Sequence, residues 1–168
     1  MPPNDELTEA ERRYLGTRYQ RLKDLTGMAL GGFAEAVVAG ALSGALEATK
    51  LTSPIDIRWT PPGRRDAILI QVKHSRGDTW GVNRDVTVEG GVRDRPLRAD
   101  VYVLTRHQGV SHLAGWTFFA VPCWRLEAEG RKRVSLGRLR RWGVEEVEAA
   151  DLPDAVVAAT ARNPPTTR

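Results

Sequence analysis

Four polar residues stand in apolar stretches of the sequence, where a polar side chain needs a partner. Glu35 lies among Ala and Gly residues, and its helical neighbours three, four and seven positions away are all apolar or small. Asp56 separates two isoleucines, and Gln71 and Lys73 alternate with Ile70 and Val72 in a strongly β-prone run. A buried carboxylate without a partner is costly, so a cation or a metal ion should compensate these acids.

These residue types could together hydrolyse a phosphodiester bond. Because side chains alternate along a strand, Gln71 and Lys73 should project from the same face. Phosphodiester hydrolysis needs a hard divalent cation, oxygen ligands that hold it and a positioned water. Asp56, the amide oxygen of Gln71 and the Val72 carbonyl could supply oxygen ligands, together with Glu35. Lys73 could orient the water or stabilise the developing negative charge.

The residues around these four predict the elements that position them. We expect an amphipathic helix from Glu9 to Leu25 and a helix of small residues from Met28 to Leu46. The second helix carries the acid Glu35 near its middle and is built mainly from Ala and Gly, so it should be a buried helix and not a membrane span. Strands from Ile55 to Trp59 and from Ala67 to His74 should form a hairpin-like pair.

The second half of the chain adds strands at Val101 to Thr105 and at Trp116 to Val121, joined by a loop that contains His107. A short strand around Val86 and Val88 could precede them. A helix from Pro153 to Arg162 should end the fold. This order predicts one α/β (α+β) domain over residues 1–168, with a central mixed sheet flanked by helices and a disordered tail at 163–168.

Composition restricts the class of protein. The chain has 168 residues and a formal charge of +4, from 25 basic and 21 acidic side chains. The lone cysteine, Cys123, excludes an internal disulfide and a cysteine-based zinc site. The first residues lack the basic and apolar regions of a secretory signal. We therefore expect a soluble cytoplasmic protein with no membrane association.

Basic residues gather in one segment. Arg125 to Arg141 contains seven basic and two acidic residues, an excess of +5. Such a run is often a solvated face, but it could also contact the backbone of DNA. A loop after the Lys73 strand adds further arginines. The candidate DNA-binding residues are Arg76, Arg84, Arg131, Lys132, Arg133 and Arg138.

The spacing of the four polar residues resembles a known family. Pro54-Ile55-Asp56 is followed by Gln71-Val72-Lys73, with Gln71 fifteen positions after Asp56. This pattern is similar to the PD-(D/E)XK nuclease superfamily, which includes restriction endonucleases and Holliday junction resolvases. The segment around Glu35 resembles the acid-bearing helix of that family, and the resemblance covers about residues 28–122. The chain departs from the usual pattern at Gln71, where most members carry an acid.

The resemblance implies a restriction endonuclease-like core and a Mg²⁺-dependent DNA endonuclease, with Mn²⁺ as a substitute. Small nucleases of this type often act as homodimers. The catalytic residues would be Glu35, Asp56, Gln71 and Lys73, and the metal would be held by Asp56, Gln71, Val72 and Glu35.

Two other readings stay open. Because Gln71 is neutral, the same fold could be a non-catalytic nucleic-acid-binding module. The chain could also be a structural or partner-binding protein that binds no metal and in which the buried acid and the lysine form an ion pair. Glu35 could instead pair with an arginine of the first helix. Asp66 could replace Asp56 as the strand acid, although it should lie on the turn side of the hairpin.

Overall fold

A mixed β-sheet forms the centre of the computed structural model, which describes residues 27–42, 47–48, 55–82, 85–88, 91–94, 97–108 and 115–161. The sheet has five strands in the order β1-β2-β3-β7-β8. β3 and β7 pair in parallel, and the other neighbours pair antiparallel. The strands are β1 (Glu47–Ala48), β2 (Ile57–Trp59), β3 (Ile68–Ser75), β7 (Val101–His107) and β8 (Trp116–Pro122).

The β2–β3 hairpin follows from its local sequence. Ile57 pairs with Ile70, and Trp59 pairs with Ile68. The turn between the strands contains Gly63 at φ 78°, a conformation that glycine adopts without steric cost. This hairpin confirms the predicted pair of strands.

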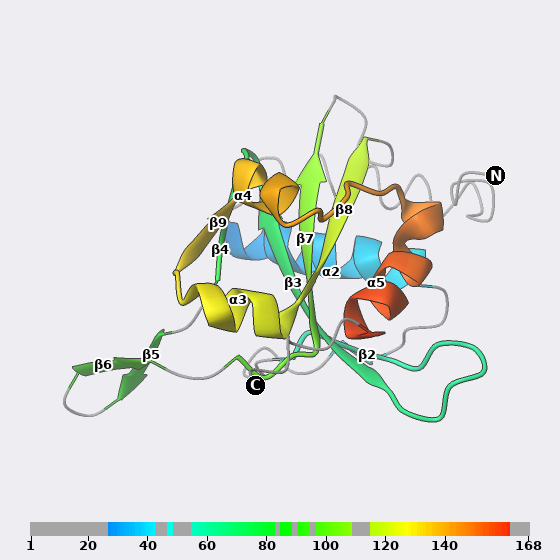
Figure 1. Ribbon diagram of the computed structural model, residues 1–168, viewed down its shortest axis with the longest axis horizontal. Helices are drawn as coiled ribbons and strands as arrows, with labels where there is room; N and C mark the ends of the chain where they lie inside the picture. The colour runs from blue at the N-terminus through cyan, green and yellow to red at the C-terminus, as the bar shows by residue number, and fades with distance from the viewer. Residues whose placement is uncertain are drawn as a thin grey trace.

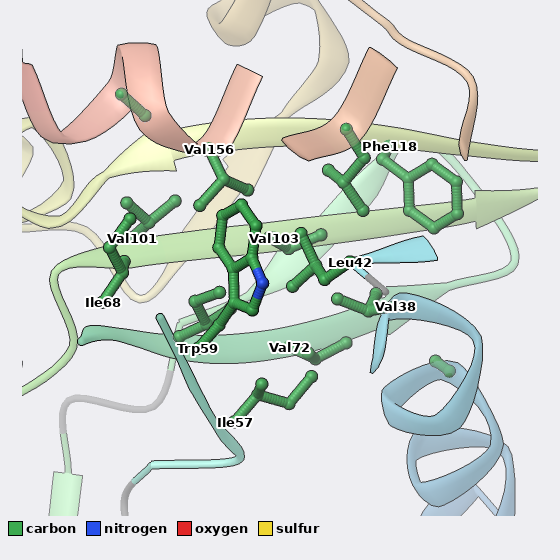
Figure 2. Close-up of a cluster of buried hydrophobic side chains, with 14 of the residues drawn as sticks. Val38, Leu42, Ile57, Trp59, Ile68, Val72, Val101, Val103, Phe118 and Val156 are labelled. Carbon is green, nitrogen blue, oxygen red and sulfur yellow. The ribbon is translucent and has the colours of Figure 1, made fainter. Parts of the chain in front are cut away.

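Two helices cover one face of the sheet. Alternation along β3 sends Ile68, Ile70 and Val72 to this face, where all three are buried. The helices α2 (Gly27–Ala41) and α5 (Leu152–Ala161) pack against them, the latter preceded by a 3₁₀ turn, η2 (Ala149–Asp151). Figure 2 shows the side chains of this core, which include Val38, Leu42, Ile57, Trp59, Val101, Val103, Phe118 and Val156.

The other face is covered by a second layer of short elements. It consists of α3 (Cys123–Glu129), α4 (Leu136–Arg141) and a two-stranded sheet of β4 (Thr79–Gly81) and β9 (Arg133–Ser135). Trp80 is fully buried there, and its Nε1 donates to the Thr105 carbonyl at 2.8 Å. In Figure 1, α3 lies in front of the sheet and α2 behind it.

A separate hairpin extends from the body of the molecule. β5 (Asp85–Val88) pairs with β6 (Gly91–Asp94), and both point away from the central sheet at the lower left of Figure 1. This confirms the short strand predicted around Val86. The hairpin lies within the connection that joins β3 to β7.

The predicted class, a mixed sheet flanked by helices, is confirmed. In the described residues α2 runs to Ala41, and β7 extends to His107, which is therefore in a strand and not in a loop. The helix predicted at 9–25, the end of the next at 43–46 and the tail at 163–168 lie outside the described residues. Among the described residues, no helix combines the length and apolar character that a membrane crossing needs.

Candidate active site

Asp56 lies directly before β2 and is held by β3. Its backbone N–H donates to the Ile70 carbonyl at 3.1 Å, so the hairpin ladder continues past the first residue of β2. Its side-chain Oδ2 accepts two hydrogen bonds of 2.7 Å, one from the Val72 backbone N–H and one from Nε2 of Gln71. The carboxylate is therefore anchored against the middle of β3.

Gln71 and Lys73 share a face of β3, as the sequence predicts. Both are half-buried, and both alternate with Ile70 and Val72, which are buried under α2 and α5. In register they stand beside Tyr102 and Leu104 of β7, which are buried under the second layer of α3, α4, β4 and β9. The amide of Val72 points toward Asp56, and because N–H and C=O of one strand residue face the same edge, the Val72 carbonyl also faces this side.

Glu35, on α2, lies close enough to Asp56 and Lys73 for their charges to act on its carboxyl. The helix packs on the sheet through Phe33, Ala34 and Val38, and Glu35 itself is half-buried. Burial is the main cause that raises the pKa of Glu35. The Asp56 carboxylate raises this pKa further, whereas the Lys73 ammonium lowers it. The three charged groups thus interact as one electrostatic cluster.

Asp56 is also held in an environment that disfavours its charge. Burial raises the pKa of Asp56, and the Val72 N–H, the Lys73 charge and the Gln71 amide oppose this shift without cancelling it. The like charge of Asp56 repels the ionised form of Glu35, and burial disfavours the ionised form of both acids. A divalent cation placed between them would relieve this repulsion.

The oxygen atoms at this edge suit a hard cation such as Mg²⁺. The oxygens that could bind such a cation are those of Glu35, Oδ1 of Asp56 and the Val72 carbonyl. Within the described residues, Oδ1 accepts no hydrogen bond. Within the described ranges, no three His, Cys, Asp or Glu side chains lie where they could hold one metal ion together. An ion here would therefore complete its shell with carbonyl or amide oxygens and with water, as Mg²⁺ commonly does.

The predicted role of Gln71 as a metal ligand depends on which atom of its side-chain amide faces Asp56. Its amide nitrogen, and not its oxygen, faces the carboxylate of Asp56.

The alternative acid, Asp66, is exposed at the hairpin turn. It lines a pocket of about 370 Å³ at the end of the sheet, together with Arg64, Asp100 and Trp124, and none of the four candidate catalytic residues lines that pocket.

The candidate DNA-binding residues are spread over the second layer. Arg76, Arg131, Lys132 and Arg133 are exposed, and Arg138 is half-buried; Arg84 lies outside the described residues. Glu129 pairs with Arg138 at 3.0 Å and with Arg131 at 3.3 Å, which neutralises part of the basic excess.

An aromatic and cationic cluster was not expected from the sequence. The guanidinium of Arg125 lies over Trp124, 4.7 Å from the ring centroid, and over Trp142, at 5.7 Å. The adjacency of Trp124 and Arg125 is visible in the sequence. The contribution of Trp142 depends on the packing of α3 beside α4, which no spacing rule reveals.

His74 faces away from the candidate site, as the alternation after Lys73 predicts. Its Nδ1 lies 3.0 Å from the hydroxyl of Thr105, a fully buried residue. The ring packs against Trp116, with 5.4 Å between the centroids. Burial lowers the pKa of His74 to about 4, with smaller effects from His107 and Arg76. His74 is therefore a neutral core residue at pH 7.

Comparison of the chain with protein-family models, with curated proteins and with solved structures finds no match. The interpretation of this site therefore rests on the residues of the chain and on their geometry.

Proposed function

We propose that this chain is a metal-dependent DNA endonuclease that hydrolyses phosphodiester bonds through a PD-(D/E)XK-type site. The observation that carries the proposal is the convergence of residues from three elements at one edge of β3. Glu35 comes from α2, Asp56 from the start of the hairpin, and Gln71 and Lys73 from β3 itself. Two partly buried acids with raised pKa values beside a lysine are the expected features of a cation-dependent site.

Each residue has a distinct role in this proposal. Bound Mg²⁺, or Mn²⁺ in its place, would supply charge neutralisation at the phosphate. Glu35, Asp56 and the Val72 carbonyl would hold the cation. Lys73 would orient the attacking water or stabilise the negative charge that develops on the phosphate oxygens.

The second layer would supply the contacts with DNA. Arg131, Lys132, Arg133 and Arg138 belong to or flank β9 and α4, which cover the sheet face from which Gln71 and Lys73 project. Arg76 follows β3 directly. Such residues would bind phosphates without reading sequence. We further propose that the protein acts as a homodimer, which would allow it to cut both strands, and that it is cytoplasmic.

The proposal is tested by incubating the purified chain with plasmid, linear and branched DNA in the presence of Mg²⁺ or Mn²⁺. We expect cleavage that EDTA stops and that Lys73→Ala abolishes. Asp66→Asn is the matched control, because this acid is exposed at the hairpin turn. Absence of cleavage on all three substrates, or cleavage that survives Lys73→Ala, would rule the nuclease out.

A non-catalytic nucleic-acid-binding module is the second candidate. The orientation of Gln71 favours it, because the amide satisfies Asp56 without any cation. In that case the protein should retain DNA with no metal-dependent cleavage, and Asp56→Ala should leave DNA binding unchanged.

A further inference from the structure

The side chain of Gln71 is committed to Asp56. Its Nε2 donates to Oδ2 at 2.7 Å, and the same oxygen accepts the Val72 N–H at 2.7 Å. An ionised carboxylate can only accept hydrogen bonds, so the amide must present its nitrogen and not its oxygen. Both bonds are short for N–H···O contacts, as expected for an ionised acceptor.

This arrangement satisfies Asp56 in the protein alone. Oδ2 is occupied by two donors, which fixes the plane of the carboxylate and leaves Oδ1 as its remaining acceptor. A glutamate at position 71 would instead bring a second carboxylate against Asp56, and the two like charges would require a proton or a cation between them. With glutamine at position 71, the two hydrogen bonds hold Asp56 in place before any cation binds.

The charges around the site point to a weak attraction for a cation. When both acids are ionised, Glu35 and Asp56 bring two negative charges, and Lys73 brings a positive charge that acts on both of them. Gln71 adds none, so the cluster has at most a single net negative charge. A DNA phosphodiester would add a second negative charge together with oxygen ligands, and Mg²⁺ is often bound by one or two carboxylates plus substrate phosphates.

We propose, on the basis of the nuclease function above, that Gln71 is a positioning residue that holds Asp56 in the cation-free protein and keeps cation affinity low until a DNA phosphate completes the site. Cation and DNA would then bind cooperatively. By linkage, each should raise the affinity for the other by the same factor. The dependence on DNA would prevent the site from holding a reactive cation when no substrate is bound.

The experiment measures cation binding and not cleavage. Calorimetry would follow Ca²⁺ binding to the wild-type chain, Gln71→Glu and Gln71→Met, each with and without a short DNA duplex. For the wild type we expect affinity at least about tenfold higher with DNA than without it. Gln71→Glu should bind the cation about tenfold more tightly without DNA and show weaker coupling, because its carboxylate replaces the charge of the phosphate.

Gln71→Met separates the donor role from a ligand role. It removes both the donor and the oxygen but leaves Glu35, Asp56 Oδ1 and the Val72 carbonyl, so cation affinity with DNA should fall by about 10- to 100-fold, as on loss of a residue that orients a metal ligand. A loss well beyond about 100-fold would identify Gln71 as a cation ligand and contradict the inference. Gln108→Glu and Gln108→Met are the matched controls, since Gln108 is exposed at the end of β7.

A nuclear magnetic resonance measurement checks the hydrogen bond itself. The side-chain NH₂ signal of Gln71, assigned by its loss in Gln71→Met, should exchange slowly in the cation-free protein. A rapidly exchanging signal, or equal cation affinity with and without DNA, would overturn the inference while leaving the nuclease proposal intact. Absence of cation binding even with DNA would overturn both.

Discussion

Two charged clusters lie along β3 and β7, and they differ in how well their charges are satisfied. At the end of these strands, Arg106 donates to Asp78 at 2.8 Å and to Glu146 at 2.7 Å. Burial alone would lower the pKa of Arg106, but the two acids raise it. In the middle of β3, Glu35 and Asp56 both have raised pKa values although Lys73 is near.

The difference separates a cluster that stabilises the fold from the cluster that we propose as the cation site. The Arg106 cluster joins β7, the loop after β3 and the segment before α5, and each acid in it meets a cation. At the Glu35–Asp56 cluster, Lys73 lowers both pKa values but does not offset the effect of burial, so both carboxyls keep raised pKa values.

Asp56→Asn should remove activity and spare the fold. It keeps the size of the side chain but loses the charge that would hold the cation, so cleavage should fall by at least about 10³-fold. Asp78→Asn, in the Arg106 cluster, should change cleavage by less than about twofold. Initial rates on plasmid DNA with Mg²⁺ measure both. Equal losses in the two variants would show that the clusters do not differ in role.

Arg106→Ala should lower the stability of the fold. Only about a tenth of the Arg106 side chain is exposed (11%), and it bridges two acids, so its loss should lower the free energy of unfolding by about 2 kcal/mol. Arg131→Ala, whose side chain is 67% exposed, should change it by less than about 0.5 kcal/mol. Urea denaturation followed by tryptophan fluorescence gives both values. A stability equal to that of the wild type would refute the structural role of Arg106.

His74 predicts a pH dependence of stability. Because burial lowers its pKa in the folded state to about 4, from 6.5 for an ordinary histidine, the folded protein favours the neutral ring. This contribution is complete above pH 6.5 and is lost as the pH falls toward 4. Unfolding should therefore become easier between pH 6.5 and 5. His74→Gln should flatten the profile over this window, and an unchanged slope would count against the buried neutral ring.

Glu35→Gln should stabilise the metal-free protein slightly. The raised pKa means that the ionised carboxylate is disfavoured in the fold, so removing the charge should help by less than about 1 kcal/mol, since half-exposure screens the effect. Thermal unfolding at pH 8 with EDTA tests this. The gain should vanish at pH values where the wild-type carboxyl is protonated, and Mg²⁺ should stabilise the wild type more than the variant.

The sequence predicts the scaffold of the site well because that scaffold is local. Alternation along residues 68–73 predicts which side chains of β3 are buried, and the Pro-Pro-Gly turn predicts the hairpin that carries Asp56. The small residues around Glu35 predict a helix that packs closely on the sheet. Each of these patterns has a single physical cause that acts within a few residues.

The parts of the structure that the sequence does not predict depend on contacts between segments far apart in the chain. α3, β9 and α4 have three to seven residues each, too few to produce a clear period, and their basic residues resemble a solvated face. β7 extends to His107 because Trp116 of β8 pairs with it. The orientation of Gln71 is decided by a carboxylate fifteen positions away, so it could not be predicted from its own strand.

The parallel pairing of β3 and β7 has a consequence for how this chain can vary. A parallel pair needs a long connection, and here that connection carries the β5–β6 hairpin, whose described strands pair with each other and not with the central sheet. Residues added or removed at its tip would leave the register of β3 against β7 unchanged, because lengthening a loop costs little. The hairpin is thus a place where the chain can change in length, or accept a fluorescent label, without disturbing the pairing of β3 with β7.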